Sequence, residues 1–142
     1  MKIGISACLC GEKVRYDGTD RKNETLLKAL EGHELIPICP ELTAGFSIPH
    51  EPLEIRDGRV CTQSGEDVTD QLNYGCKECL DQIMDCDMVI LKEKSPSCGI
   101  RQIYDGSFSG TLIKGNGLFA RLCMDNAIPV LTEDDIGMLK ED

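Results

Sequence analysis

Apolar residues recur along this chain with two spacings, one typical of strands and one typical of helices. Four short apolar or alternating segments predict strands, at residues 2–7, 34–38, 88–91 and 128–131. Apolar residues three and four apart predict helices, at residues 24–31, 67–85 and 118–126. Because strands alternate with helices, we expect a Rossmann-like α/β fold, a mostly parallel sheet with helices on both faces and right-handed crossovers.

Residues 42–66 interrupt this alternation and are expected to form an insertion. Within it, the segments 53–56 and 59–61 flank Asp57-Gly58, a pair common at the centre of tight hairpin turns, so we expect a β-hairpin. The glycine-rich and serine-rich segment 104–110 is expected to be a loop. A chain of 142 residues then fits one domain with a hairpin inserted.

The net charge and the absence of long apolar runs limit the kinds of partner that this protein is expected to bind. Asp and Glu number 25 against 15 Lys and Arg, which gives a formal net charge of −10. This charge repels phosphate backbones and anionic lipids, so groove-bound nucleic acid and membrane surfaces are both disfavoured. The sequence begins MKIGISACLCG, without a charged and then apolar leader, and no apolar run reaches the roughly 18 residues of a membrane span. We expect a cytoplasmic protein, of unspecified oligomeric state.

Nine cysteines are expected to be reduced in such a compartment and to serve as core atoms, metal ligands or reactive thiols. The pair Cys76-x-x-Cys79 lies on the apolar side of the predicted helix 67–85 and is therefore interpreted as packing, rather than as a zinc or redox motif. The same interpretation is given to Cys61, Cys86 and Cys123.

Cys8, Cys39 and Cys98 differ because each follows a different predicted strand. The carboxyl ends of parallel strands meet at one edge of a sheet, where ligands bind beside the point at which strand order reverses. Neighbouring strands are about 4.8 Å apart, so thiols at adjacent strand ends can reach one object a few ångström across. We expect a shared inorganic centre at this edge.

Ligation by thiolates alone suits zinc, copper(I) or an iron–sulfur cluster. Zinc would need a fourth ligand, for which His33, His50 or Cys10 is available. A 4Fe-4S cluster held by three thiolates would leave one iron open for chemistry. The sequence spacing of the cysteines does not decide between these centres. It also does not exclude three unrelated loop thiols or one reactive cysteine.

Several longer motifs resemble one known family. In chain order they are SACL (6–9), VRYDG (14–18), CPE (39–41), GEDVT (65–69), KEKSPSCG (92–99) and YDGSFSGTL (104–112). Together they resemble the thiouracil desulfidase family, long catalogued as a domain of unknown function. The resemblance implies a 4Fe-4S cluster held by residues that correspond to Cys8, Cys39 and Cys98, with the fourth iron free.

The resemblance also implies an enzyme. In this family the free iron takes the sulfur of a thiocarbonyl such as 2-thiouracil while water attacks the carbon, and no electrons are exchanged. The partner of this chain would be a thiolated pyrimidine or related thioamide. Glu41 is expected to activate water as a general base, and Ser97 to relay or donate a proton. The candidate substrate contacts are Arg15, Tyr16, Asp17, Ser95 and Ser109.

Structural alternatives stand beside these roles. Glu41 would alternatively be a helix N-terminal carboxylate, and Ser97 a hydroxyl that caps its own loop. The chain also departs from the family pattern. Where the family usually has a double glycine and then a Pro-Arg pair, this chain has Ala44-Gly45 and Pro49-His50, and Cys10 replaces a usual aliphatic residue and could close the site as a fourth ligand. Two other functions stay open, a non-catalytic module held by zinc or a closed cluster, and a sulfur carrier.

Overall fold

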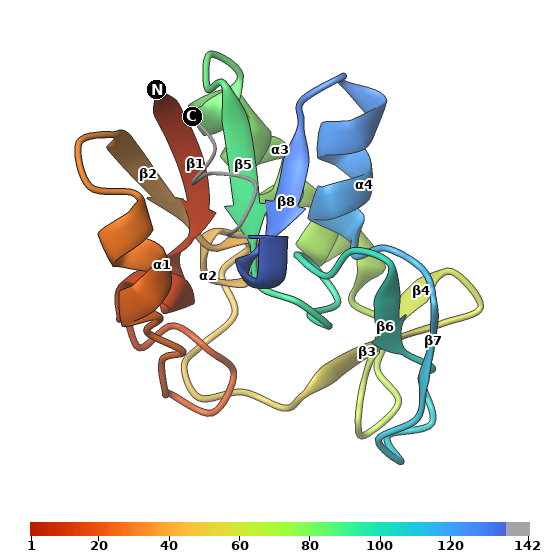
Figure 1. The fold of residues 1–142 in the computed structure, drawn as a ribbon. Helices are drawn as coiled ribbons and strands as arrows, with labels where there is room; N and C mark the ends of the chain where they lie inside the picture. The colour runs from red at the N-terminus through yellow and green to blue at the C-terminus, as the bar shows by residue number, and fades with distance from the viewer. Residues whose placement is uncertain (136–142) are drawn as a thin grey trace.

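A computed structural model describes residues 1–135, and a four-stranded sheet lies at its centre (Figure 1). The strands are β1 (Lys2–Ser6), β2 (Glu34–Ile38), β5 (Met88–Leu91) and β8 (Val130–Thr132). Their order is β2-β1-β5-β8, and every neighbouring pair is parallel. The α/β class with a parallel sheet that the sequence predicts is confirmed.

Strand order reverses at β1. The register pairs Ser6 with Ile38 of β2 on one side and Ile5 with Ile90 of β5 on the other. The chain therefore crosses away from β1 in opposite directions, which is the arrangement that opens a crevice at the carboxyl ends of the strands.

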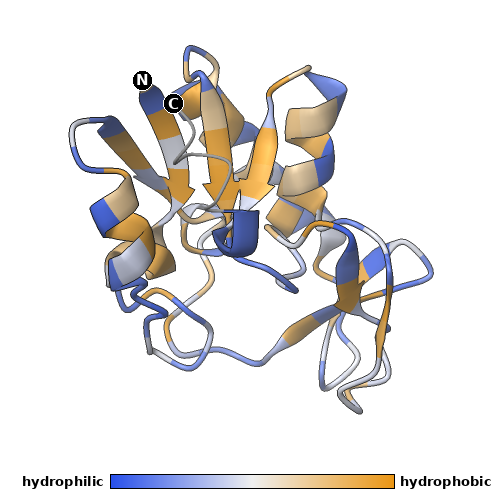
Figure 2. Cartoon of the chain, in the orientation of Figure 1, coloured by the Kyte–Doolittle hydropathy of each residue, from blue (hydrophilic) through white to orange (hydrophobic). Residues whose placement is uncertain are grey.

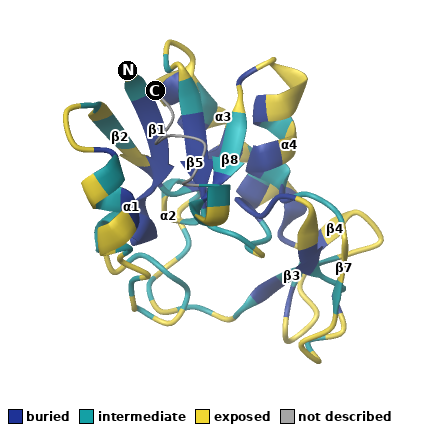
Figure 3. Cartoon of the chain, viewed as in Figure 1, coloured by how far each residue is buried: buried dark blue, intermediate teal, exposed yellow. Residues whose placement is uncertain are grey.

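Successive side chains of a strand point to opposite faces of a sheet. Helices cover both faces here, and the central strands β1 and β5 are largely apolar and buried (Figures 2 and 3). On one face, Ile3 and Ile5 pack with Leu26 of α1 (Glu24–Ala29). On the other face, Val89 and Leu91 pack with α3 (Thr69–Ile83) and α4 (Leu118–Asp125). Each of these three predicted helices is present, and no end is displaced by more than two residues.

The apolar residues of α3 lie along one side of the helix, as their spacing in the sequence predicts. Cys76 and Cys79 lie on this side with Leu72 and Ile83, and all four side chains are at most 1% exposed. Cys123 of α4 belongs to the same core, and all nine cysteines are free thiols. The interpretation of Cys76 and Cys79 as packing residues agrees with this burial.

The insertion forms the expected hairpin, β3 (Leu53–Arg56) and β4 (Arg59–Thr62). Its turn residues Asp57 and Gly58 have φ values of 50° and 78°. Both values lie in the left-handed region that a type I′ turn requires, which explains why an Asp-Gly pair marks this position.

A second hairpin, β6 (Gln102–Tyr104) and β7 (Leu112–Lys114), was not expected. The predicted loop 104–110 connects its strands. Glu54 of β3 accepts hydrogen bonds from the backbone of Gly106 and Phe108, at 3.0 and 3.1 Å, so the two hairpins lie together below the carboxyl edge of the sheet (Figure 1). Two short helices complete the fold, the 3₁₀ turn η1 (Ala7–Cys10) and α2 (Pro40–Thr43).

None of the helices within residues 1–135 combines the length and the apolar composition needed to cross a bilayer.

Candidate metal and catalytic site

A cavity of about 580 Å³ lies below the carboxyl ends of β1, β2 and β5. The strand-end loops form one wall, and the two hairpins and the segment around Arg15 form the others (Figure 1). Cys8, Cys39 and Cys98 all line it. The convergence of three thiols at one edge, inferred from strand ends, is therefore present in the fold.

Cys8 is placed by the tight turn that follows β1. It is the second residue of η1, and its backbone oxygen accepts hydrogen bonds from the N–H groups of Gly11 and Arg21, at 3.2 and 2.9 Å. Gly11 ends the turn at a φ of 97°, a value that glycine adopts without strain.

Cys39 directly follows β2 and caps the N-terminus of α2. Its Sγ accepts a hydrogen bond from the Leu42 N–H at 3.5 Å, and Pro40 occupies the first helical position. Helix α2 is fixed against α3 at Gly75, where an added Cβ would overlap the Pro40 oxygen and lie 2.7 Å from the Ala44 Cβ. The packing of α3 therefore sets the position of Cys39 and of its neighbour Glu41.

Cys98 lies further from its strand, in a loop that is held by the start of α4. The N–H groups of Phe119 and Ala120 donate to the Ser97 oxygen, at 2.8 and 3.2 Å. Within the loop, Ser95 Oγ accepts hydrogen bonds from the N–H groups of Ser97 and Cys98, each at 3.1 Å. Loop capping is thus performed by Ser95, and the Ser97 hydroxyl points to other partners.

Burial raises the pKa of each of these thiols. The pKa of Cys8 rises to about 11 and that of Cys39 to about 12, while that of Cys98 is raised well above its usual range. The adjacent thiols add to the shifts of Cys39 and Cys98, and Lys92 and Arg15 oppose the shift of Cys8. A reactive cysteine needs a lowered pKa, so this environment is against a lone nucleophilic or sulfur-carrying thiol.

The geometry is also against a single zinc ion. Within residues 1–135, no three His, Cys, Asp or Glu side chains approach one another closely enough to ligate one metal ion. In a 4Fe-4S cluster the thiolates bind different irons, so they need not converge on one point. Three thiols that line one cavity without converging on one point are compatible with a cluster.

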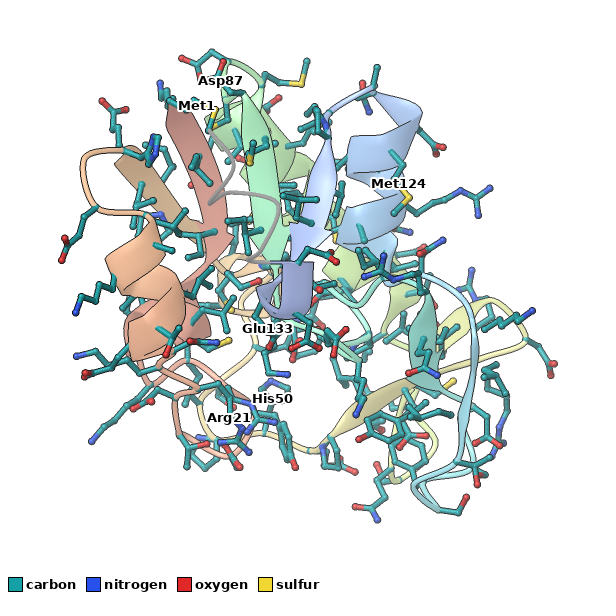
Figure 4. All side chains as sticks on the ribbon, in the orientation of Figure 1. Met1, Arg21, His50, Asp87, Met124 and Glu133 are labelled. Carbon is teal, nitrogen blue, oxygen red and sulfur yellow. The ribbon has the colours of Figure 1, made fainter. Side chains whose placement is uncertain are left out.

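The proposed fourth ligands lie elsewhere. His33 Nδ1 is 2.9 Å from the N-terminal amine, at the amino end of the sheet, where Figure 4 labels Met1. Cys10 is absent from the cavity wall and packs against the apolar cluster of the α1 side, which includes Leu9 and Leu26. His50 contacts Glu41 rather than a cysteine.

Glu41 and Ser97 are brought together at the cavity wall. Ser97 Oγ donates to Glu41 Oε2 at 3.1 Å, lies 2.9 Å from Ser95 Oγ and 3.7 Å from Cys98 Sγ. Because Ser97 gives its hydrogen to the carboxylate, the hydrogen between the two serines comes from Ser95. A directed chain of hydroxyl groups thus ends at a carboxylate beside a candidate ligand. Glu41 also lies in the first turn of α2, as its structural alternative expected.

The five candidate substrate contacts divide into two groups. Arg15, Tyr16 and Ser95 line the cavity. Asp17 is instead bonded to Thr19, whose hydroxyl donates to it at 2.5 Å, and Ser109 Oγ lies within an exposed hydroxyl cluster of the β6–β7 loop. Both of the latter residues stand outside the cavity wall.

Sequence reasoning missed several wall residues, among them Lys92, Tyr104 and Phe108. All three belong to motifs already singled out, so aromatic rings in a loop motif were an available signal. Arg15 Nη1 is buried without a hydrogen-bond partner, and its nearest carboxylate oxygen, on Asp17, is 4.0 Å away. This cation is free to face a negative group in the cavity.

Comparison with known proteins gives concordant results. The model of a family described as 2-thiouracil desulfurase matches residues 3–135. The uncharacterised protein YbbK of Bacillus subtilis (strain 168) is 38% identical over 146 residues, which cover 94% of this chain and 97% of that protein. A solved structure of the 4Fe-4S-dependent thiouracil desulfidase TudS matches with 38% identity and a TM-score of 0.91, over 98% of this chain and 95% of that one. The resemblance drawn from the sequence motifs is confirmed.

Proposed function

Because this chain belongs to the 2-thiouracil desulfurase family, we propose that it is a 4Fe-4S-dependent desulfidase, which removes sulfur from a thiocarbonyl compound such as 2-thiouracil. The observation that carries the proposal is that three thiols and a serine–carboxylate pair line one cavity. The balanced reaction takes a thiocarbonyl and water to a carbonyl and hydrogen sulfide, without an oxidant or reductant.

Cys8, Cys39 and Cys98 would hold the cluster. Their support is their common cavity, the burial of Cys8 and Cys98, the partial burial of Cys39, and the thiolate preference of iron–sulfur clusters. When bound through three thiolates, the cluster supplies an iron without a protein ligand, a Lewis acid for the sulfur of the thiocarbonyl. Lys92 and Arg15 supply positive charge beside Cys8, which offsets the negative charge of buried thiolates.

Glu41 and Ser97 would move the protons. Glu41 takes a proton from the attacking water, and its carboxylate is already oriented by the hydroxyl of Ser97. Ser97 can return a proton to the departing sulfur, because its Oγ lies between Glu41 and the ligand Cys98. Ser95 supports Ser97 in two ways. Its Oγ accepts a hydrogen bond from the Ser97 backbone N–H, and its hydroxyl donates to the Ser97 hydroxyl.

The remaining wall suits a small planar substrate. Tyr104, Phe108 and Pro52 offer flat apolar surfaces, and a volume of about 580 Å³ is within the usual range for small-molecule sites. A thiolated pyrimidine or related thioamide is the substrate class that this proposal names. A cytoplasmic location forms part of the proposal, supported by the nine unpaired thiols.

The proposed desulfidase function is tested under anaerobic conditions. Purified protein is assayed for iron and acid-labile sulfide, then incubated with 2-thiouracil, and uracil and hydrogen sulfide are quantified together. We expect about four irons and four sulfides per chain, as the composition of a 4Fe-4S cluster requires, and equal amounts of the two products. A fully loaded protein that releases no sulfide from 2-thiouracil or from other thiopyrimidines and thioamides would contradict the proposal.

A further inference from the structure

His50 is not among the residues that line the cavity, but its side chain contacts the carboxylate of Glu41, which does line it. Its Nε2 lies 3.3 Å from Glu41 Oε1, and its Nδ1 lies 2.6 Å from the backbone oxygen of Glu51. Both ring nitrogens therefore face oxygen atoms that accept hydrogen bonds, Nδ1 in a hydrogen bond and the buried Nε2 in an ion-pair contact that lacks hydrogen-bond geometry. Both contacts are favourable only when both nitrogens carry hydrogen, so the arrangement selects the positively charged imidazolium.

The ring is held in place on several sides. The backbone N–H of His50 donates to the backbone oxygen of Tyr16 at 2.7 Å, and the imidazole ring packs against the Phe46 ring with a centroid distance of 5.2 Å. The Tyr16 ring is 6.3 Å away. The side chains of His50 and Glu41 are only 9% and 17% exposed, so their attraction is screened less than that of a surface ion pair.

The contact gives Glu41 a second anchor. Helix α2 has only four residues, and the terminal torsion of a glutamate rotates broadly when nothing fixes it. Here Oε2 accepts from Ser97 and Oε1 faces His50, so both oxygens have partners on different elements. Loss of the His50 partner would leave a single hydrogen bond to orient the carboxylate.

We propose that His50 is a positioning residue for the desulfidase reaction, which holds the Glu41 carboxylate in the orientation that activates water. This inference rests on the proposed function and assigns His50 no contact with substrate or cluster. The segment that carries His50 leads from α2 to the β3–β4 hairpin, so the insertion contributes to the site through this residue. Figure 4 shows His50 below the carboxyl end of the sheet, at the opposite end of the molecule from Met1.

Protonation of His50 gives the proposal a pH signature. The Glu41 carboxylate raises the pKa of His50 above its ordinary value, while burial opposes the rise. The other groups around the ring are the phenol of Tyr16, which has the Arg15 guanidinium 5.6 Å from its ring centroid, and the Glu51 backbone in its own segment. Below the raised pKa the ring is charged and holds Glu41, and as pH rises through that pKa the attraction is lost.

The first measurement follows the imidazoles by NMR under anaerobic conditions. The chain has only two histidines, so His33→Gln assigns both signals. We expect His50 to titrate above pH 6.5, the ordinary value, and its midpoint to fall in Glu41→Gln. An unchanged midpoint in Glu41→Gln would overturn the proposed contact, and this outcome does not depend on catalytic activity.

The second measurement follows kcat and KM for 2-thiouracil against pH, at matched iron content. We expect His50→Gln to lower kcat by between about tenfold and about 10²-fold with KM little changed, because a displaced catalytic group slows the chemical step. His50→Arg should restore part of kcat and remove the decline at high pH, since arginine keeps its charge. His33→Gln is the matched control and should behave as wild type.

The outcomes separate the two proposals. If the wild-type holoprotein is active and His50→Gln keeps its kcat and pH profile, the role of His50 is wrong and the desulfidase function stands. If the loaded wild type is inactive, the proposed function is wrong, while the NMR titration still decides whether His50 pairs with Glu41.

Discussion

Ser97 Oγ donates a hydrogen bond to Glu41 Oε2 across 3.1 Å and joins the loop after β5 to helix α2 after β2, although the two residues are 56 positions apart in sequence. Each residue is within two positions of a candidate cluster ligand, Glu41 after Cys39 and Ser97 before Cys98. The backbone that fixes the ligands therefore also fixes the groups that would move protons. Ligation and acid–base chemistry would depend on the same two segments, the start of α2 and the loop after β5.

Glu41→Gln should abolish base catalysis without loss of the cluster. We expect kcat for 2-thiouracil to fall by about 10²-fold to 10⁴-fold, the usual contribution of a positioned base, with iron content unchanged. Glu31→Gln, at an exposed position after α1, is the matched control. Kinetics on protein of measured iron content test this, and full activity of Glu41→Gln would exclude it as the base.

Ser97→Ala should cost less than Glu41→Gln, because the carboxylate keeps its other contacts and a water molecule can take the place of a hydroxyl. We expect a fall in kcat of between about tenfold and about 10²-fold, measured by sulfide release. Ser107→Ala, in the exposed β6–β7 loop, is the control. Loss of iron in Ser97→Ala would instead assign the hydroxyl a role in ligation.

The effect of a cysteine substitution on iron content should depend on where that cysteine lies in the fold. Cys8→Ser, Cys39→Ser and Cys98→Ser remove thiols of the cavity wall and should each lose most of the iron after anaerobic purification. Cys10→Ser should retain it, because Cys10 packs on the α1 side of the sheet. Iron and sulfide analysis decides this, and retention of a full cluster in Cys98→Ser would remove that residue from the ligand set.

Sequence patterns predicted the position of these thiols because strand ends of a parallel sheet converge whatever the intervening loops do. They did not predict β6 and β7, since three-residue strands are too short for alternation to stand out. Helix α2 was anticipated only through the structural alternative for Glu41, although a cysteine followed by proline is a recognisable start. The contact between His50 and Glu41 depends on the path of the insertion, which local patterns do not determine.

Gly75→Ala should damage the site from a distance. An added Cβ would overlap the Pro40 oxygen, so α2 must move away from α3 and carry Cys39 and Glu41 with it. We expect a loss of about 1–3 kcal/mol in the free energy of unfolding, typical of overpacking, together with lower iron content. Urea unfolding and iron analysis test this against Lys77→Ala on the exposed side of α3. Unchanged iron content would show that α2 tolerates the shift.

Removal of the cluster should abolish activity and leave the fold intact. Two apolar clusters pack along both faces of the sheet, and the three thiols lie at one edge of it. The core therefore does not depend on a metal centre in the way that small zinc domains do. Treatment with a chelator and an oxidant should stop sulfide release but preserve the far-UV circular dichroism spectrum and cooperative unfolding in urea. Anaerobic reconstitution with iron and sulfide should restore activity, and addition of zinc should not. An unfolded metal-free protein, or full desulfidase activity with zinc, would contradict this account, the first by giving the centre a structural role and the second by removing the requirement for iron.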